Sequence, residues 1–289
     1  MLSVFCGIML ALMLRFPLVV LHSARNGFDA FTNSILPTLF PYMVFCQLTG
    51  DMLTRKTSLP SMIPCAVLGL LGGSPNGARI CAAMYTQGHL TRRQLHTLCA
   101  LCGTISPIFI LGTLENWAKQ QHFGACVLLA HWLGALICGL ITYIWTNDKK
   151  MYRDEQSEQR SSAAPLRLTD AIIQSAQAML GIGGCIMLFS VLAAMPAAIF
   201  PNISPVIRAV LHGLLEMAGG SQALIQLPLS SSLRCSAVSA CISWGGIFIM
   251  MQNLLFLRPV GIRLLQLILI RFAHAVLSGF IAFFIILLF

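Results

Sequence analysis

Charged residues are scarce in this sequence. Only 9% of its 289 residues are Asp, Glu, Lys or Arg, whereas 57% are apolar; soluble domains have about 25% charged residues. A soluble protein needs a charged surface, and this chain has too few charges to make one. Several stretches of about 20 residues, the length that crosses a bilayer core of about 30 Å, contain no ionisable group. We therefore expect a polytopic, all-α integral membrane protein embedded in a lipid bilayer.

Catalytic and metal-binding motifs are also missing. The chain has no GxSxG nucleophile elbow, no HExxH zinc motif, no Walker loop and no pair of intramembrane aspartates. Most of the eleven cysteines lie in apolar runs, where a free cysteine behaves as a small hydrophobic residue. The CxxC of Cys99 and Cys102 lacks the second pair or histidines of a metal site. We predict no enzyme activity, no cofactor and no metal.

The net charge of +9 does not indicate a nucleic-acid partner. The basic residues are scattered over short loops and form no stripe with interleaved aromatic residues. A multi-spanning protein collects such an excess of Lys and Arg on its cytoplasmic side. The charge therefore favours membrane topology as its explanation.

The N-terminal part begins with a short apolar span, residues 2–16, which Pro17 ends. Apolar residues then recur at steps of three and four as far as Ile35, with polar residues on the other side. This pattern predicts an amphipathic helix in the membrane interface. Pro37 and Pro41 are expected to redirect the chain into the next crossing.

The remaining sequence predicts one order of elements twice: a crossing, a hairpin, a broken helix and a closing crossing. The first set covers residues 38–53, 60–90, 93–118 and 123–146, and the second covers 171–200, 204–228, 232–256 and 264–288. The hairpins are predicted because helix-breaking residues at membrane depth are tolerated only where they are buried or line a wet cavity. The run GLLGGSPNG over 69–77 is the strongest such break, and GTISP over 103–107 is the next.

Short sequence matches support a repeat. Residues 69–74 match 213–218, the run SPIFI at 106–110 matches GGIFI at 245–249, and Ala-His occurs at both 130–131 and 273–274. Three crossings per half place the second half upside down relative to the first. We therefore predict two inverted repeats, each with a re-entrant hairpin and a broken transmembrane helix, a pattern typical of secondary transporters.

The predicted domain boundaries follow from this repeat. Residues 1–26 are an N-terminal span and interfacial segment, 27–146 the first repeat, 147–169 a cytoplasmic linker and 170–289 the second repeat. Eleven of the eighteen Lys and Arg residues fall on the linker side under this topology. The positive-inside rule makes that side cytoplasmic. Arg25, Lys119, Arg208 and Arg234 remain for the opposite side.

Arg79 is the first candidate for a binding residue, because an intramembrane charge costs about 2.5–3.5 kcal/mol and is kept for function. The half-helix after Gly77 points its free N–H groups at the break, where an anion is favoured. Ser106-Pro107 reads as a second helix N-terminus, with an N-cap followed by proline. We predict a carboxylate-binding pocket between the hairpin tips; the alternative is that Arg79 pairs with Glu216 or extends to the interface.

Glu216 can carry a coupling proton or cation, or can serve only as the partner of Arg79. His131 and His274 can relay protons or simply pack between helices, and Arg271 is expected to be a pairing or interfacial charge. The predicted substrate-binding residues all flank the four breaks: Ser74, Asn76, Gly77, Arg79, Thr104, Ser106, Glu216, Gly219, Gly220, Ser243 and Gly245.

The run GGSPNGAR over 72–79 resembles the glycine-x-proline-x-glycine-alanine-lysine signature of the YlbJ-type sporulation integral membrane proteins. Residues 102–112 resemble a second block of that family, residues 27–41 its entry segment and residues 213–219 its second hairpin. Arginine stands at 79 where lysine is usual, which keeps the charge. These proteins belong to the nucleoside-recognition, or Gate, group, whose layout is similar to the core of concentrative nucleoside transporters.

The resemblance implies a role in endospore formation, linked to moving dipicolinic acid across a membrane around the forespore. Such a small anionic solute suits a pocket with an arginine and two helix N-termini. Two alternatives stay open: a non-transporting scaffold for spore-envelope (cortex) assembly, and a nucleoside-type transporter. The first hairpin tip has no acidic residue, which weighs against nucleosides. Neither the coupling ion nor the oligomeric state follows from the sequence.

Overall fold

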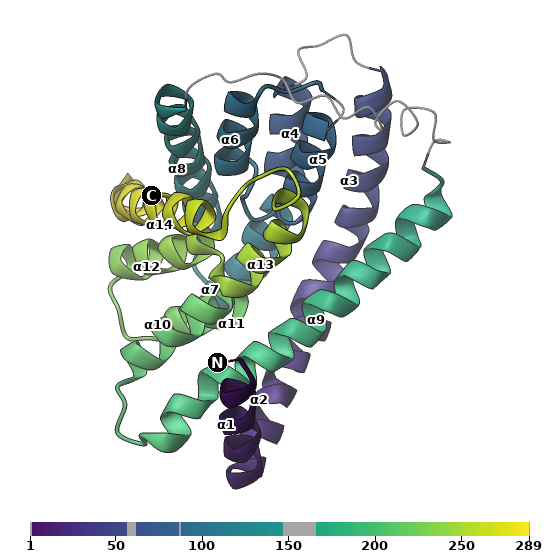
Figure 1. The fold of residues 1–289 in the computed structure, drawn as a ribbon. Coiled ribbons are helices and arrows are strands. Elements are labelled where there is room, and N and C mark those ends of the chain that lie inside the picture. Colours follow the sequence, from purple (N-terminus) through teal and green to yellow (C-terminus); the bar gives the residue numbers. More distant parts are fainter. Residues whose placement is uncertain (1, 57–61, 87, 147–165, 289) are drawn as a thin grey trace.

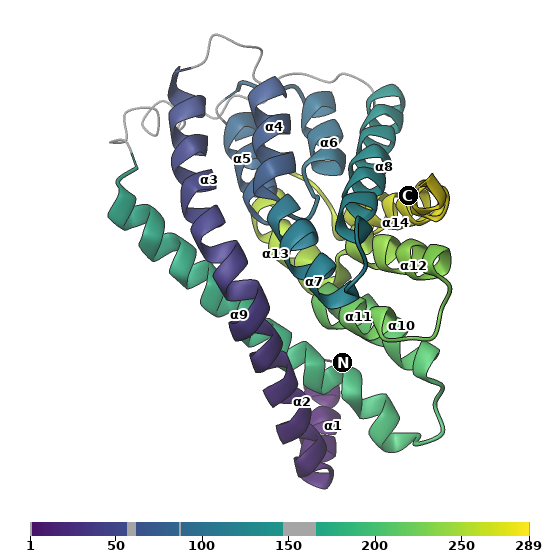
Figure 2. The same ribbon diagram turned by 180° about the vertical axis from the view of Figure 1, so that it is seen from behind.

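The computed structural model describes residues 2–56, 62–86, 88–146 and 166–288. Every regular element among these residues is a helix. Figures 1 and 2 show the helices as one bundle, with α9 crossing its edge diagonally beside α2 and α3. The all-helical class predicted from the composition is confirmed for this part of the chain.

The N-terminal arm contains α1 (Leu2–Arg15), α2 (Pro17–Ala30), a π-helical turn (Phe31–Ile35) and α3 (Leu36–Lys56). The chain bends by 100° between α1 and the helix that begins at Pro17, as Pro17 predicts. The prediction that Pro37 and Pro41 redirect the chain is wrong, because α2, the π-helical turn and α3 follow one another without a break. A proline removes one N–H and crowds the preceding turn, and the wider π turn just before Pro37 gives the extra room.

The first hairpin is formed by α4 (Met62–Gly72) and α5 (Asn76–Thr86). The chain reverses in a three-residue turn at 73–75, where Gly73 has a φ of +64° that glycine adopts without steric cost. The broken helix follows as α6 (Arg92–Leu101), a π-helical segment (Phe109–Leu114) and α7 (Glu115–Ala118), and α8 (Phe123–Trp145) closes this half. The first break, at 73–75, falls inside the predicted run 69–77, and the second, at 102–106, begins one residue before the predicted run 103–107.

A capping box starts α6. The Thr91 hydroxyl accepts from the Gln94 N–H at 3.3 Å, and the Gln94 side chain accepts from the Thr91 N–H at 2.8 Å. Because alanine cannot satisfy the Gln94 N–H, Thr91→Ala should lower the free energy of unfolding by about 1 kcal/mol. Thr91→Ser should restore most of that loss. Denaturation midpoints of the purified protein in detergent check this, and equal midpoints for the alanine and serine variants would contradict it.

The second half repeats the order of elements. It contains α9 (Leu168–Ile199), a hairpin of α10 (Pro205–Leu215) and α11 (Met217–Ile225), a broken helix of α12 (Ser231–Trp244) and α13 (Gly246–Leu257), then α14 (Leu264–Ile285) and a final 3-10 turn (Ile286–Leu288). Hydroxyl groups begin two of these helices, since Ser204 and Ser230 each accept a backbone N–H of the first turn. In Figure 1 α3 rises toward the top of the bundle whereas α9 descends from it.

Four helical segments in the described residues are long and apolar enough to cross a membrane: 123–145, 168–199, 231–257 and 264–288. The bent pair that starts at Ser3 and Pro17 makes a fifth if it is counted as one span. The predicted crossing at 93–118 is not among them, since α6 has only 10 residues and begins with Arg92, Arg93 and Gln94. The broken helix therefore enters the bundle with a polar end.

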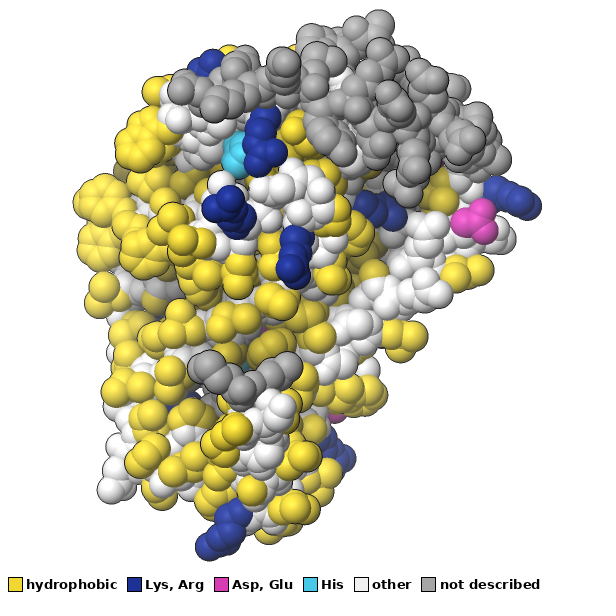
Figure 3. All heavy atoms as spheres, in the orientation of Figure 1, with side chains coloured by type: hydrophobic (Ala, Val, Ile, Leu, Met, Phe, Trp, Pro, Cys, Tyr) yellow, Lys and Arg dark blue, Asp and Glu magenta, His cyan; other side chains and the backbone are white. Residues whose placement is uncertain are grey.

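Two basic side chains of α6 contact other elements on one side of the bundle. Arg92 on α6 donates to the Gly261 carbonyl at 3.2 Å, and Arg93 donates to the Tyr143 carbonyl at 2.7 Å while lying over the Tyr143 ring. Figure 3 shows most of the visible Lys and Arg side chains over the upper half of that face, above a largely apolar surface. This grouping agrees with the predicted shared side of the loops before α6 and between α13 and α14. Lys149, Lys150, Arg153 and Arg160 lie outside the described residues.

The halves share their apolar interior. One core cluster joins residues such as Phe109 and Val127 of the first half to Ile242 and Ala282 of the second, and another joins Leu98 to Leu267.

Glycines let the N-terminal arm approach α9 closely: a Cβ at Gly27 would lie 2.8 Å from Ser190 Oγ, and one at Gly183 would lie 2.7 Å from the Phe31 ring. The N-terminal arm is therefore held tightly against α9.

Candidate functional site

Three cavities surround the hairpin tips. The first has a volume of about 310 Å³ and lies between α3, the first hairpin and the start of α9. The second, of about 620 Å³, lies between α2, the end of α9 and the second hairpin. A small central cavity of about 50 Å³ separates the two tips. We call them the Arg79 cavity, the His212 cavity and the central cavity.

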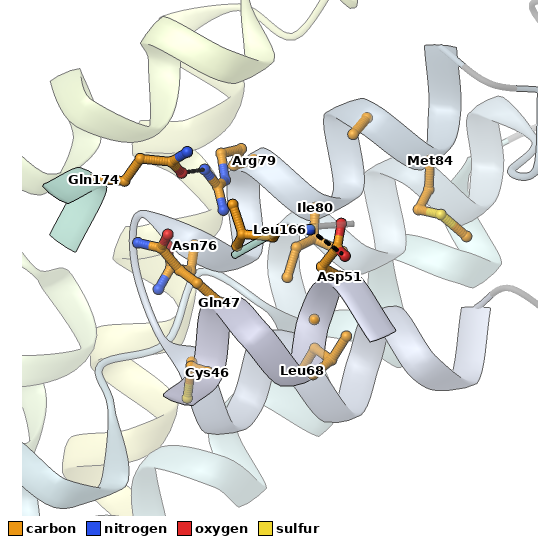
Figure 4. A pocket seen from close by; sticks show the side chains of 13 residues that line it. Cys46, Gln47, Asp51, Leu68, Asn76, Arg79, Ile80, Met84, Leu166 and Gln174 are labelled. Atoms are coloured by element: carbon orange, nitrogen blue, oxygen red, sulfur yellow. Dashed lines mark hydrogen bonds between the residues drawn. The ribbon is translucent and has the colours of Figure 1, made fainter. Parts of the chain in front are cut away.

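The Arg79 cavity brings together polar groups from three elements (Figure 4). Arg79 lies in the first turn of α5 and donates from Nη1 to Gln174 Oε1 on α9 at 3.3 Å. At the other end of the cavity, Asp51 Oδ2 on α3 accepts from the Leu166 N–H at 3.0 Å. One end of the cavity is therefore basic and the other acidic.

Two buried amides in this cavity have hydrogen-bonding capacity left over. Gln47 is 6% exposed and Asn76 is 7% exposed. Gln47 donates from Nε2 to Ser175 Oγ at 3.2 Å, but Gln47 Oε1 and Asn76 Nδ2 have no partner within the described residues. Leaving a buried polar atom unsatisfied costs about 1–3 kcal/mol. Such atoms beside a guanidinium and a cavity are what a ligand-binding site needs.

The central cavity is lined by Ser74 at the first tip, Ser106 at the first broken helix, Glu216 at the second tip and mostly apolar side chains. The first tip is fixed on both sides: the Ser74 N–H donates to the Thr104 carbonyl at 2.7 Å, and Ser74 Oγ donates to Asn253 Oδ1 at 3.0 Å. Because it is small and closed in by these contacts, the central cavity holds no more than a few atoms in this conformation.

Glu216 is the N-cap of α11. Its two carboxylate oxygens accept from the backbone N–H groups of Ala218 and Gly219, both at 2.7 Å, and the residue is 3% exposed. Among the described residues no Lys, Arg or His nitrogen lies within 4.0 Å of the carboxylate. Its stabilisation therefore comes from backbone dipoles rather than from a counter-ion.

The predicted site residues do not converge on one pocket. Asn76 and Arg79 line the Arg79 cavity, Ser74, Ser106 and Glu216 line the central cavity, and Gly219 lines the His212 cavity. Arg79 and Glu216 make no ion pair, because their side chains lie in different cavities.

Five predicted residues lie in backbone contacts or inside the bundle. Gly77 packs on the Cys102 carbonyl, Gly220 packs on the Gly213 backbone, and Gly245 has a φ of +82°. Thr104 is fully buried, 3.5 Å from the Gly69 carbonyl, and the fully buried Ser243 contacts His131. Their predicted role in binding substrate stays a prediction.

A buried polar network links the two broken helices. The Ile105 N–H donates to His131 Nε2 at 3.0 Å, so the His131 proton lies on Nδ1 and reaches Ser243 Oγ at 2.8 Å. His274 donates from Nε2 to the His131 carbonyl at 2.8 Å, and the two rings stack with centroids 4.7 Å apart. Both histidines are 0% exposed.

Arg271 completes this network and corrects a prediction. It is 2% exposed and donates to the Cys99 carbonyl at 3.4 Å, so it is not an interfacial charge. Its Nη1 also lies 3.4 Å from His274 Nδ1. A cation at the end of α6 interacts favourably with the last carbonyls of that helix. The repeated Ala-His pair together with an intramembrane arginine was the signal for this network in the sequence.

In the described part of the chain no three His, Cys, Asp or Glu side chains come together as a group that could hold a metal ion.

Comparison with known proteins adds one finding. The chain is 22% identical over 219 residues to the sporulation integral membrane protein YlbJ of Bacillus subtilis (strain 168), which is 63% of this chain and 52% of YlbJ. It thus spans about half the length of that relative. No family model matches the chain, and no solved structure matches it. The apolar spans and this relative identify a multi-pass membrane protein, and the predicted similarity to the YlbJ-type sporulation integral membrane proteins is confirmed.

Proposed function

We propose that this protein is a transporter, not an enzyme, that moves a small carboxylate across a bacterial cytoplasmic membrane during endospore formation. Dipicolinic acid is the proposed substrate, and a membrane around the forespore is the proposed location. The observation that carries the proposal is the Arg79 cavity, which is lined by a guanidinium and by the buried amide of Asn76, whose Nδ2 donor has no partner in the described residues. The relative YlbJ is a sporulation integral membrane protein, which supports endospore formation as the process in which this protein acts.

The chemistry of the cavity suits a carboxylate. Arg79 has further N–H donors beyond the one that binds Gln174, and Asn76 Nδ2 provides another. Both residues lie in the first turn of α5, where the helix dipole favours negative charge. A cavity of about 150 Å³ accommodates a benzene molecule, so 310 Å³ leaves room for a single aromatic ring that carries two carboxylates.

The proposed architecture is an inverted repeat similar to the core of concentrative nucleoside transporters. Two observations support this architecture. The order of elements recurs from α3 to α8 and from α9 to α14, and α3 and α9 run in opposite directions. In this scheme the two hairpin tips stand between the Arg79 cavity on one side and the His212 cavity on the other.

Uptake of dipicolinate into liposomes that contain the purified protein tests this function. Arg79→Gln should lower the uptake rate by about tenfold or more, because losing a hydrogen bond to a charged group costs about 1.5–3 kcal/mol. Arg79→Lys should keep part of the activity because it keeps the charge. Arg25→Gln changes an exposed arginine on α2 and serves as the matched control.

Two results would contradict the proposal. If the wild-type protein moves no dipicolinate in either direction, dipicolinate is not the substrate. If Arg79→Gln and Arg25→Gln transport equally well, the Arg79 cavity is not the binding site.

A further inference from the structure

The carboxylate of Glu216 lies in an unusual position for a charged group. It is 3% exposed, sits at the tip of a hairpin inside the bundle and has no cation within 4.0 Å among the described residues. Intramembrane acidic groups are costly and commonly serve as proton carriers. The backbone N–H groups of Ala218 and Gly219 hold the carboxylate in place, but they supply no proton.

His212 lies beside this carboxylate, one helical turn earlier on α10. A methyl group built on Gly219 would contact His212 Nε2 and would lie 3.3 Å from Glu216 Oε2, so both atoms border the same small space. They are more than 4.0 Å apart, a separation that one water molecule can bridge. His212 Nε2 is buried and has no hydrogen-bond partner in the described residues. The imidazole therefore has an unused nitrogen on the Glu216 side.

The same histidine lines the His212 cavity, which is about 620 Å³ in volume and whose wall is polar and apolar in about equal parts. Arg208 on α10 and Asp29 on α2 contribute opposite charges to that wall. Glu216 itself lines the central cavity on the other side of the tip. His212 thus stands between a polar cavity and a buried carboxylate.

The other elements around Glu216 bring few groups that could exchange a proton with it. Cys185 on α9 and Cys241 on α12 are near enough to interact with its charge. Nothing on α13 titrates, and Glu115 at the start of α7 is bound to the Gly124 and His122 N–H groups. His212 is the group best placed to deliver a proton.

We infer that Glu216 is the proton-binding site that couples transport to a proton gradient, and that His212 loads it from the His212 cavity. This rests on the proposed transport function and adds the coupling ion to it. In the loading step a bridging water gives a proton to Glu216 Oε2 and takes the Nε2 proton of the imidazole. The imidazole takes up one proton at Nδ1 from the water of the His212 cavity, so the ring stays neutral and changes tautomer, and it returns to the first tautomer before the next loading step. Unloading returns the Glu216 proton to solvent when the second hairpin tip moves.

Protonation of Glu216 is measured without any substrate. Infrared difference spectra of the protein in lipid vesicles should gain protonated-carboxyl absorption as the pH falls. Subtracting the spectra of Glu216→Gln from those of the wild type removes the absorption of the other carboxyl groups and should leave a band that belongs to Glu216. His212→Gln, and Gly219→Ala, which fills the space between the two groups, should keep the band but slow its appearance after a pH jump by about tenfold or more. His22→Gln, at an exposed histidine on α2, is the matched control and should change nothing.

Transport then tests the coupling. Glu216→Gln should lose accumulation driven by a pH gradient while keeping exchange of labelled for unlabelled substrate, because exchange needs no net proton movement. The inference is overturned if the wild type and Glu216→Gln give the same carboxyl absorption at every pH, or if this variant still accumulates substrate in response to the gradient. If no substrate moves even by exchange, the proposed function fails, whereas the infrared result still decides whether Glu216 binds a proton.

Discussion

Replacing Gly220 by valine should prevent the second hairpin from closing and should sharply lower the yield of folded protein. Gly220 on α11 faces Gly213 on α10, and a Cβ at Gly220 would overlap the Gly213 backbone. Backbone cannot move aside as a flexible side chain can, so the two helices must separate. Overpacking of this kind costs about 1–3 kcal/mol and occasionally more, and we expect the upper end here. The fraction of monodisperse protein after heating in detergent measures the loss.

Gly184→Val is the matched control for that change. Gly184 lies on α9 and is exposed, and a Cβ added there would have no atom within 4 Å. Surface substitutions away from special features usually change stability by less than about 0.5 kcal/mol. Equal thermal stability of the two valine variants would show that the hairpin does not need the close approach of Gly213 and Gly220.

His131→Ala should destabilise the protein by about 3–5 kcal/mol, because it removes packing volume and also orphans buried polar groups. The Ile105 N–H would lose its acceptor, Ser243 would lose its partner and the His274 ring would lose its stacking neighbour. Denaturation midpoints in detergent check this. Ser243→Ala removes only one hydrogen bond and should cost about 1 kcal/mol.

His89→Ala changes an exposed histidine and should leave stability almost unchanged. A His131→Ala variant as stable as His89→Ala would mean that the network between the broken helices contributes nothing to the fold. Retained stability with lost transport would instead assign the network to the transport cycle.

The order of elements was predictable because each helix break depends on residues at the break itself. Glycine, proline and serine interrupt apolar runs at 69–77, at 103–107 and around Gly245, and each signal acts within a few residues. The uninterrupted passage from α2 into α3 was not predictable in this way. There a π-helical turn precedes Pro37, Pro41 lies within α3, and neither residue carries a signal for that arrangement.

The sequence predicted which residues flank the hairpin breaks, but it did not predict which of these residues share a cavity. Arg79 and Glu216 both flank hairpin breaks, as expected, yet they face different cavities. Arg79 lies three residues beyond Asn76, so both lie on one face of α5, and in the structure this face is turned toward Gln174 on α9. Such a direction depends on how α9 packs across the bundle, which the spacing of residues within α5 does not encode.

The stacked pair of His131 and His274 shows how the two halves fit together. In the order of elements, α8 and α14 correspond, and His131 on α8 stacks on His274 on α14. The two helices approach closely at Gly134, where a Cβ would lie 3.0 Å from the His274 ring. Contact between equivalent residues is the mark of an isologous interface, as in two-fold symmetric dimers. Under the proposed inverted repeat, a polypeptide with only one half would present the same contact surface as its counterpart, and we expect two copies inserted in opposite orientations to associate through it.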